Sequence, residues 1–358
     1  MAEITNTRVD WYRTPLDKSV LANLNKRSDF KGFLQSLGHL GLLTLTGGAA
    51  IYGVGQWPFG PGRWPWYVVL AILFLHGTMF AFMINAVHEL VHGAVFKTKF
   101  WNEFFVRVFG FLGWIGFEMF YTSHKRHHQY TLHAPDDLEV TLPIKVLTKH
   151  FFQWGFLNPL GIRFVVQNTW RVAHGRFQGE WEQFLFPESE PERRKRVMNW
   201  AWFILAGHAT IIIVSLCFKL WMVPVVTSFA PFYGSWLFFL CNNTQHIGLQ
   251  DDVPDFRLCC RTFTVNPFVQ FLYWHMNYHI EHHMYAAVPC YNLGKLHRAI
   301  KHDLPPCPSG IAACWQEIAA IQRKQVEDPT FKHVAAVPSH EDPDIGHEAH
   351  SMGYEALA

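Results

Sequence analysis

Long uncharged stretches alternate with charged segments along the chain. The four longest cover residues 32–62, 64–87, 197–218 and 220–250. Each reaches or exceeds the roughly 20 apolar residues that a helix needs to cross a bilayer. The pattern therefore predicts an all-α, multi-pass membrane protein with four transmembrane helices in two hairpins. The expected spans are about 34–56, 66–90, 197–218 and 221–245.

A fifth apolar run, 108–117, is too short to cross a bilayer and is bounded by Arg107 and Glu118. It predicts an interfacial or re-entrant helix. The remaining divisions follow from composition. We expect a cytosolic N-terminal segment (1–33), a membrane domain (34–305), a C-terminal helical segment (306–325) and a disordered, polar tail (326–358).

Basic residues indicate the orientation of the spans. The chain contains 30 Lys and Arg residues, of which Arg63 and Lys219 lie in the short loops inside the hairpins; 30 minus these two leaves 28 on the other side. The positive-inside rule assigns that side to the cytoplasm, together with both termini. The first 30 residues lack the apolar core of a cleavable signal peptide, so the first span is expected to direct insertion.

Bulk composition excludes some classes of function. The formal net charge of +2 gives no reason to expect a nucleic-acid partner. The seven cysteines show no C-x-x-C spacing, which is typical of structural thiols in a reduced compartment.

Histidines carry the candidate chemistry. On a helix, residues at i, i+3 and i+4 point the same way, so H-x-x-x-H and H-x-x-H-H each aim their imidazoles at one side. Imidazole is a common metal ligand, and so many of them in this spacing predict a metal site. The nine candidate ligands are His88 and His92 in HELVH, His124, His127 and His128 in HKRHH, His246 in NTQHI, and His279, His282 and His283 in HIEHH.

The histidines also repeat. Between His92 and His124 lie 31 residues, and between His246 and His279 lie 32, so the chain resembles two similar halves. The second half has Asn242 where the repeat would place a histidine. Because an amide is a poor ligand for a transition metal, we expect Asn242 to hold a metal-bound water. The pattern predicts two half-sites, one for each helical hairpin.

Other interpretations of these motifs are weaker. HELVH matches the zinc-protease pattern H-E-x-x-H, but the other seven histidines disfavour a protease. A membrane transporter of transition metals would place polar ligands near the bilayer midplane, whereas these histidines lie at the cytosolic ends of the spans. His39, His76 and His208 lie inside apolar stretches and are expected to make hydrogen bonds between helices.

HELVH, HKRHH and HIEHH, with the intervening NTQHI, resemble the three histidine boxes and the extra histidine of the integral-membrane fatty acid desaturase and hydroxylase superfamily. The resemblance covers residues 34–305. It implies four spanning helices beneath a cytosolic helical cap that holds a non-haem di-iron centre. It also implies that the nine histidines bind two iron ions and that Asn242 holds a water. Ligand type alone would also allow zinc or copper, so iron rests on the resemblance.

The resemblance implies oxygen-dependent attack on an unactivated alkyl chain of a fatty acid or acyl-lipid. Desaturation is favoured, and hydroxylation and decarboxylation to a terminal alkene remain alternatives. Because the sequence shows no electron-carrier segment, we expect a separate donor of the ferredoxin, rubredoxin or cytochrome b5 type with its reductase. The membrane would be a bacterial inner membrane or the endoplasmic reticulum.

Acidic and aromatic residues near the boxes are further candidates. Ligating imidazoles usually donate their second ring N–H to a carboxylate or carbonyl. The candidate partners are Glu89, Asp136, Asp137 and Glu281, with Asp251 and Asp252 nearby. An apolar tunnel in the cap is expected to hold the substrate, and the aromatic candidates to line it are Trp114, Phe117, Tyr121, Trp154 and Trp274.

Overall fold

The computed structural model describes residues 4, 6–56, 62–144 and 148–338. Within these ranges every regular element is a helix, and the β contacts are isolated bridges between single residues. This confirms the all-helical class. The helices are α1 (Lys18–Leu24), α2 (Asp29–Gly53), α3 (Trp66–Phe80), α4 (Met83–Val91), α5 (Lys99–Leu112), α6 (Phe117–Tyr130), α7 (Thr148–Gly155), α8 (Pro159–Ala173), α9 (Gly179–Leu185), α10 (Pro191–Cys217), α11 (Met222–Val226), η1 (Ala230–Phe232), α12 (Trp236–Asn242), α13 (Phe256–Cys259), α14 (Pro267–Leu272), α15 (His279–Met284), α16 (Cys290–Ile300), η2 (Lys301–Asp303) and α17 (Ile311–Glu327).

Two helical stretches in the described residues are long and apolar enough to cross a membrane. One is Trp66–Val91, in which α4 follows α3 almost without a break, and the other is α10. A third span is present if α5 and α6, which meet at a bend of 110°, count as one. The first two coincide with the predicted spans 66–90 and 197–218. The bend between α5 and α6 lies at the run predicted to be interfacial or re-entrant, 108–117.

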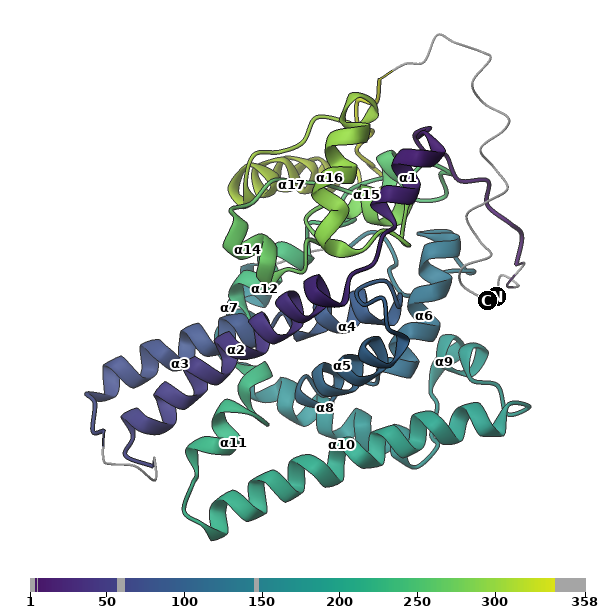
Figure 1. Cartoon of the computed structure of the whole chain (residues 1–358). Coiled ribbons are helices and arrows are strands. Elements are labelled where there is room, and N and C mark those ends of the chain that lie inside the picture. Colours follow the sequence, from purple (N-terminus) through teal and green to yellow (C-terminus); the bar gives the residue numbers. More distant parts are fainter. Residues whose placement is uncertain (1–3, 5, 57–61, 145–147, 339–358) are drawn as a thin grey trace.

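The first predicted span is a single helix. α2 has 25 residues and packs along α3, so the two form the predicted hairpin (Figure 1). It begins where the Ser28 side chain accepts a hydrogen bond from the Lys31 amide. α2 is long enough to cross a bilayer, but it is less apolar than the two stretches named above.

The fourth predicted span, 221–245, is not one continuous helix. It divides into α11, η1 and α12. Pro224 and Pro231 lack the backbone N–H that a helix interior needs. Gly234 adopts φ +75°, and its backbone lies so close to α3 that a Cβ atom would be 2.8 Å from the Phe74 carbonyl oxygen. The apolar run is long enough for a span, but its prolines and glycine break the helix.

Histidines inside the apolar stretches make the packing hydrogen bonds predicted for them. His39 Nε2 lies 3.0 Å from the Met79 carbonyl, His76 Nε2 lies 2.8 Å from that of Val226, and His208 Nε2 lies 2.9 Å from that of Phe111. Each polar ring is therefore satisfied inside the helical bundle.

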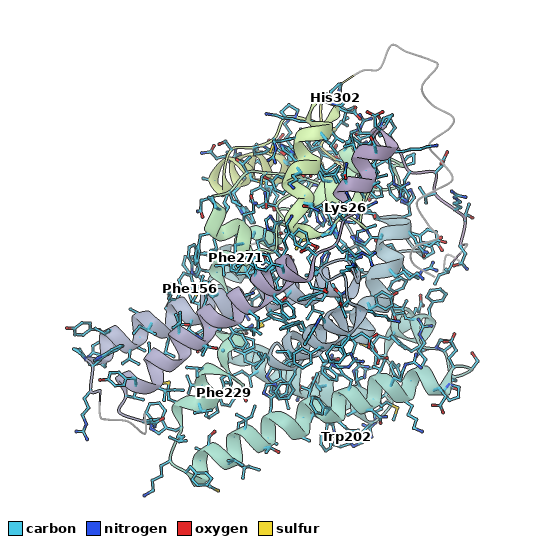
Figure 2. The ribbon with its side chains drawn as sticks, viewed as in Figure 1. Lys26, Phe156, Trp202, Phe229, Phe271 and His302 are labelled. Atoms are coloured by element: carbon cyan, nitrogen blue, oxygen red, sulfur yellow. The ribbon has the colours of Figure 1, made fainter. Side chains whose placement is uncertain are left out.

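Large apolar side chains remain exposed along the helices. Two of them, Trp202 on α10 and Phe156, are labelled in Figure 2, and their side chains are 41% and 40% exposed. The ring of Phe156 lies 6.0 Å from that of Phe74 on α3. Phe203 and Ile213 on α10 are 56% and 60% exposed. An apolar surface of this kind suits contact with lipid.

The helices α14 to α17 gather with α1 into a cap at one end of the molecule, the α2–α3 hairpin extends away from this cap, and α10 lies along the opposite end (Figure 1). One large core joins this cap to the hairpin, because Leu43 on α2 and Met79 on α3 pack in the same cluster as Trp274 and Met284. The histidine-bearing segments lie within this shared core.

The C-terminal helical segment predicted at 306–325 is α17. Beyond it, the His333 amide donates to the Gly248 carbonyl at 2.8 Å, and Lys332 contacts Asp251. The described start of the predicted tail thus packs on the cap. The rest of that tail, 339–358, lies outside the described residues.

Candidate metal centre

Three short helical segments and a turn carry the nine predicted ligands. His88 lies in the last turn of α4, and His92 follows its end. The second box occupies the C-terminal half of α6, and the third begins α15. His246 lies in the turn after α12. Seven of the nine are buried, and His92 and His128 are partly buried, so water has little access to the rings.

The structure brings the histidines into two groups. The ligand atoms within each group all lie within 4.8 Å of one another. The first group is His88, His92, His124, His128 and His282, and the second is His246, Cys260, His279 and His283.

His127 belongs to neither group by this distance, but its ring centroid lies 5.2 Å from that of His246 and 5.0 Å from that of His283. It is therefore a neighbour of the second group. The two halves of the chain thus exchange one histidine each: His282 joins the first group and His127 approaches the second. The prediction of one half-site per hairpin needs this correction, because the second and third boxes face each other.

Distances between ring nitrogens fit a metal ion. His128 Nε2 lies 3.0 Å from His124 Nε2 and 3.1 Å from His282 Nε2. Ligand nitrogens that are about 2.1 Å from one ion are separated by about 3.0 Å at octahedral and about 3.4 Å at tetrahedral angles. The nitrogens are thus spaced as neighbouring ligands of one ion would be.

Hydrogen bonds at the outer ring nitrogens decide where the imidazole protons lie. His88 Nδ1 lies 3.0 Å from Glu89 Oε1, and His124 Nδ1 lies 2.7 Å from Glu139 Oε1. An ionised carboxylate can only accept a hydrogen bond, so each of these Nδ1 atoms carries the proton when its glutamate is charged. The Nε2 atoms then present lone pairs to the interior of the group, which is the form that binds a metal.

The same reasoning applies to the second group. His246 Nδ1 donates to the Cys259 carbonyl at 2.8 Å. The Thr131 hydroxyl donates to the His127 carbonyl at 2.6 Å, so its oxygen accepts from His283 Nδ1 at 3.2 Å. Both His246 and His283 therefore present an unprotonated Nε2.

His279 lies between these two lone pairs. Its Nε2 is 3.0 Å from that of His246 and 3.2 Å from that of His283. A single N–H on His279 could satisfy only one of them, and its own Nδ1 is buried without a hydrogen-bond partner. A cation among the three nitrogens would resolve the conflict. The donor set thus fits a metal ion in each group.

Electrostatics keep the third box neutral. Burial lowers the pKa of His279, His282 and His283 well below 6.5, so their rings are uncharged and available as ligands at neutral pH. Burial also raises the pKa of Glu139 to about 7. Burial alone would raise the pKa of Asp137 too, but the His127 ring and the hydrogen bonds to this carboxylate outweigh burial and lower it.

The predicted acidic partners divide into two kinds. Glu89 contacts two histidines, since its Oε1 also lies 3.4 Å from His282 Nδ1, and Asp137 Oδ2 accepts from His127 Nδ1 at 2.8 Å. Asp136 instead binds the Arg126 guanidinium at 3.0 Å. Glu281 is fully buried and accepts from Thr262 Oγ1 and His297 Nδ1.

Asn242 ends α12 and is partly buried. Within the described residues its side-chain amide makes no hydrogen bond to a histidine. Its predicted role in holding a water therefore stays a prediction.

Three contributors were missed by the sequence interpretation. Glu139 ends the acidic run that begins at Asp136, and this run was a sequence signal for a carboxylate near the boxes. Glu139 itself lies 15 residues after its partner His124. Thr131 and Cys260 gave no signal, because a hydroxyl and a thiol of these kinds are common in any core. Cys260 enters the second group only through the folding of the chain segment after α13.

The aromatic residues predicted to line a tunnel occupy mixed positions. The Trp274 indole donates to His39 Nδ1 at 3.1 Å, and Trp114 stacks on His208. Tyr121 and Trp154 are 38% and 43% exposed, and Phe117 packs edge-on against the ring of a tryptophan on α10. The tunnel itself stays a prediction.

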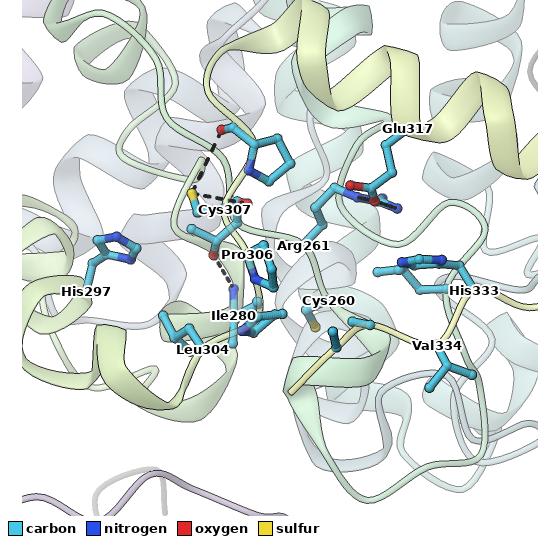
Figure 3. Close-up of a pocket in the computed structure, with 16 residues that line it drawn as sticks. Cys260, Arg261, Ile280, His297, Leu304, Pro306, Cys307, Glu317, His333 and Val334 are labelled. Atoms are coloured by element: carbon cyan, nitrogen blue, oxygen red, sulfur yellow. Dashed lines mark hydrogen bonds and ion pairs between the residues drawn. The ribbon is translucent and has the colours of Figure 1, made fainter. Parts of the chain in front are cut away.

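A cavity of about 250 Å³ lies on the cap behind the second group (Figure 3). Cys260 and Ile280 line it on the metal side, and Arg261, His297, Cys307 and His333 line its walls. It is separate from the converging Nε2 atoms, so it is not the metal centre itself.

Comparison with known proteins agrees with the boxes and their geometry. No curated protein sequence matches the chain. The family model for fatty acid desaturases matches residues 63–312, which is more than half of the chain and includes all nine histidines. The chain therefore belongs to the fatty acid desaturase family.

Proposed function

We propose that this protein is an oxygen-dependent fatty acid desaturase that uses two iron ions to convert a single bond of an acyl chain into a double bond. Family membership makes it an oxidoreductase of the desaturase and hydroxylase type. The observation that carries the finer proposal is the pair of groups in which buried imidazoles point unprotonated Nε2 atoms at one another.

Each iron would have its own set of histidines. The first group would hold one ion through His88, His92, His124, His128 and His282, and the second would hold the other through His127, His246, His279 and His283, with Asn242 acting through a water. Bound iron would supply the oxygen chemistry that attacks an unactivated C–H bond. The balanced reaction takes two hydrogens from neighbouring carbons, one O2, two electrons and two protons, and yields one alkene and two waters.

The protein's own residues position and shield this centre. Glu89, Glu139 and Asp137 orient the rings of three histidines, and burial of most ligands keeps bulk water away. Because α4 continues the apolar stretch that begins at α3, the first box lies at the end of a membrane span. This placement suits a fatty acid or acyl-lipid that enters from the bilayer.

The remaining parts of the proposal concern partners and location. A separate donor of the ferredoxin, rubredoxin or cytochrome b5 type, with its reductase, would supply electrons on the cytosolic side. The basic residues favour a cytosolic cap and cytosolic termini in a multi-pass protein of a bacterial inner membrane or the endoplasmic reticulum.

Product analysis tests the proposal. Lipids from cells expressing the wild type would be compared by mass spectrometry with those from His128→Ala, and the exposed residue His302 provides the matched control His302→Ala. We expect a product lacking two hydrogens in the wild type and in His302→Ala, and none in His128→Ala. An added oxygen would indicate a hydroxylase, and loss of the carboxyl carbon a decarboxylase. The same product in His128→Ala would refute the metal assignment.

Oxygen uptake separates the enzyme from a transporter. Purified protein supplied with a reduced donor should consume oxygen when acyl substrate is present. Metal flux across a vesicle membrane without oxygen consumption would overturn the desaturase proposal in favour of transport.

A further inference from the structure

The segment before α1 is anchored across the metal-binding part of the cap. The Tyr12 amide donates to the Pro254 carbonyl at 2.8 Å, and the Thr14 hydroxyl donates to Asp303 at 2.6 Å. The Arg13 guanidinium donates to the Met284 carbonyl at 2.7 Å, and Met284 ends α15. Figure 1 shows α1, which follows this segment, beside α15 and α16.

Trp11 is the centre of these contacts and is only 2% exposed. Its indole N–H donates to the Gln129 carbonyl at 2.8 Å, and Gln129 follows the ligand His128 directly. Its ring stacks on Phe256 at 4.1 Å between centroids, and the Phe256 ring lies 5.4 Å from that of His283. One side chain thus touches the supports of a ligand in each metal group.

The helices that carry these two ligands need outside support. Gln129 lies in the last turn of α6, where backbone carbonyls have no partner within the helix. The Trp11 indole supplies the missing donor. α15 has only six residues, and helices this short are not stable alone. Its position must come from neighbours such as Phe256 and the Arg13 guanidinium.

We propose that Trp11 is a positioning residue for the metal centre. It sets the separation between His128 of the first group and His283 of the second by holding the end of α6 and, through Phe256, the side of α15. The inference rests on the proposed function, because it assumes that both groups bind metal. Groups behind metal ligands usually change metal affinity by roughly 10- to 100-fold when they are removed.

Two variants separate the hydrogen bond from the stacking. Trp11→Phe keeps a ring against Phe256 and removes the N–H, whereas Trp11→Leu removes both. Trp200→Phe is the matched control, since the Trp200 indole on α10 also donates to a backbone carbonyl, that of Ile115, at 2.9 Å. Each full-length protein would be purified without metal and titrated with Co²⁺ against a chelator. Bound metal per chain, the visible ligand-field spectrum and the thermal unfolding midpoint would be measured.

We expect Co²⁺ affinity to fall about 10-fold in Trp11→Phe and about 100-fold in Trp11→Leu, with an altered ligand-field spectrum in both. Trp200→Phe should keep the wild-type affinity and spectrum. A loss in Trp11→Leu alone would assign the positioning to the stacked ring. If Trp11→Leu does not fold, Trp11→Phe decides.

Wild-type affinity and spectrum in the Trp11 variants would overturn the inference, as would a loss that only follows a lower unfolding midpoint. A wild-type protein that binds no Co²⁺ would instead overturn the proposed function. The two failures are therefore distinguishable.

Discussion

Replacing Asp137 by asparagine should release a metal ion from the second group. Asp137 is fully buried, and its two oxygens accept three hydrogen bonds, from His127 Nδ1 at 2.8 Å and from the amides of Leu132 and Glu139 at 2.9 Å each. An asparagine amide has one oxygen and one NH2 group. In its best orientation the NH2 faces the Glu139 amide, so two donors meet. In the other orientation it faces His127, which would have to move its proton to Nε2 and lose its metal-binding lone pair.

The magnitudes follow from these bonds. A hydrogen bond to a charged group contributes about 1.5 to 3 kcal/mol, and a buried donor left without an acceptor costs about 1 to 3 kcal/mol. Loss of a carboxylate behind a metal-binding histidine lowers affinity by roughly 10- to 100-fold. Because stability and affinity change by similar free energies, both must be measured on the same protein.

The assay is a competition titration of metal-free protein against a chelator, with bound metal counted by elemental analysis and unfolding followed in parallel. Asp136→Asn is the control, since this neighbour pairs with Arg126. We expect Asp137→Asn to hold one ion tightly instead of two, while Asp136→Asn keeps both. Equal metal content and affinity in the two folded variants would refute the reasoning about proton placement.

Three further predictions concern the first group, acid and packing. Glu89→Gln should weaken metal binding in the first group by roughly 10-fold, because a neutral amide oxygen is a weaker acceptor than a carboxylate for the His88 Nδ1–H, and the exposed Glu103→Gln should not; equal chelator curves would contradict this. Metal-free protein should lose stability as pH falls below 6.5. Burial holds the pKa of His279 well below 6.5 in the folded protein, so only the unfolded chain takes up the proton, and an unfolding midpoint that stays constant between pH 7 and about pH 5 would count against this. Gly77→Ala should lower the unfolding midpoint, because the new Cβ would clash with the Tyr233 carbonyl, which follows η1. Gly41→Ala has open space around it and should raise stability by up to about 1 kcal/mol, and the reverse order of the two midpoints would contradict the helix packing described above.

The apolar pattern predicted the helical class and two of the spans, at 66–90 and 197–218. The prediction of one span at 221–245 was wrong, because it relied on hydropathy and gave too little weight to the helix-breaking prolines and Gly234. A transmembrane length rule counts apolar residues, but it takes no account of how closely a backbone must approach its neighbour. The contact between Gly234 and α3 belongs to the folded chain alone.

At the candidate metal centre, the i, i+4 spacing predicted which histidines act together, because each such pair falls in one group: His88 with His92, His124 with His128, and His279 with His283. The i, i+3 spacing did not, since His127 and His282 each face the group opposite to the rest of their box. Spacing could not predict that His282 would join the first group, since that depends on how α15 packs against α4 and α6. It also could not find Glu139, whose link to His124 depends on the path of the chain after α6.

The sequence by itself determined the candidate ligands of this protein: eight imidazoles in helical spacing and His246, beside apolar spans, are sufficient to predict a membrane metal site. Tertiary structure decided the rest. It assigned the histidines to the two groups and set carboxylates and carbonyls beside the Nδ1 atoms of several rings. It also brought Trp11 behind the second and third histidine boxes. The reason is that helical periodicity relates residues within one or two turns, whereas the groups join separate segments. The first group joins histidines more than a hundred residues apart, and the second depends on how the chain between His246 and His279 packs.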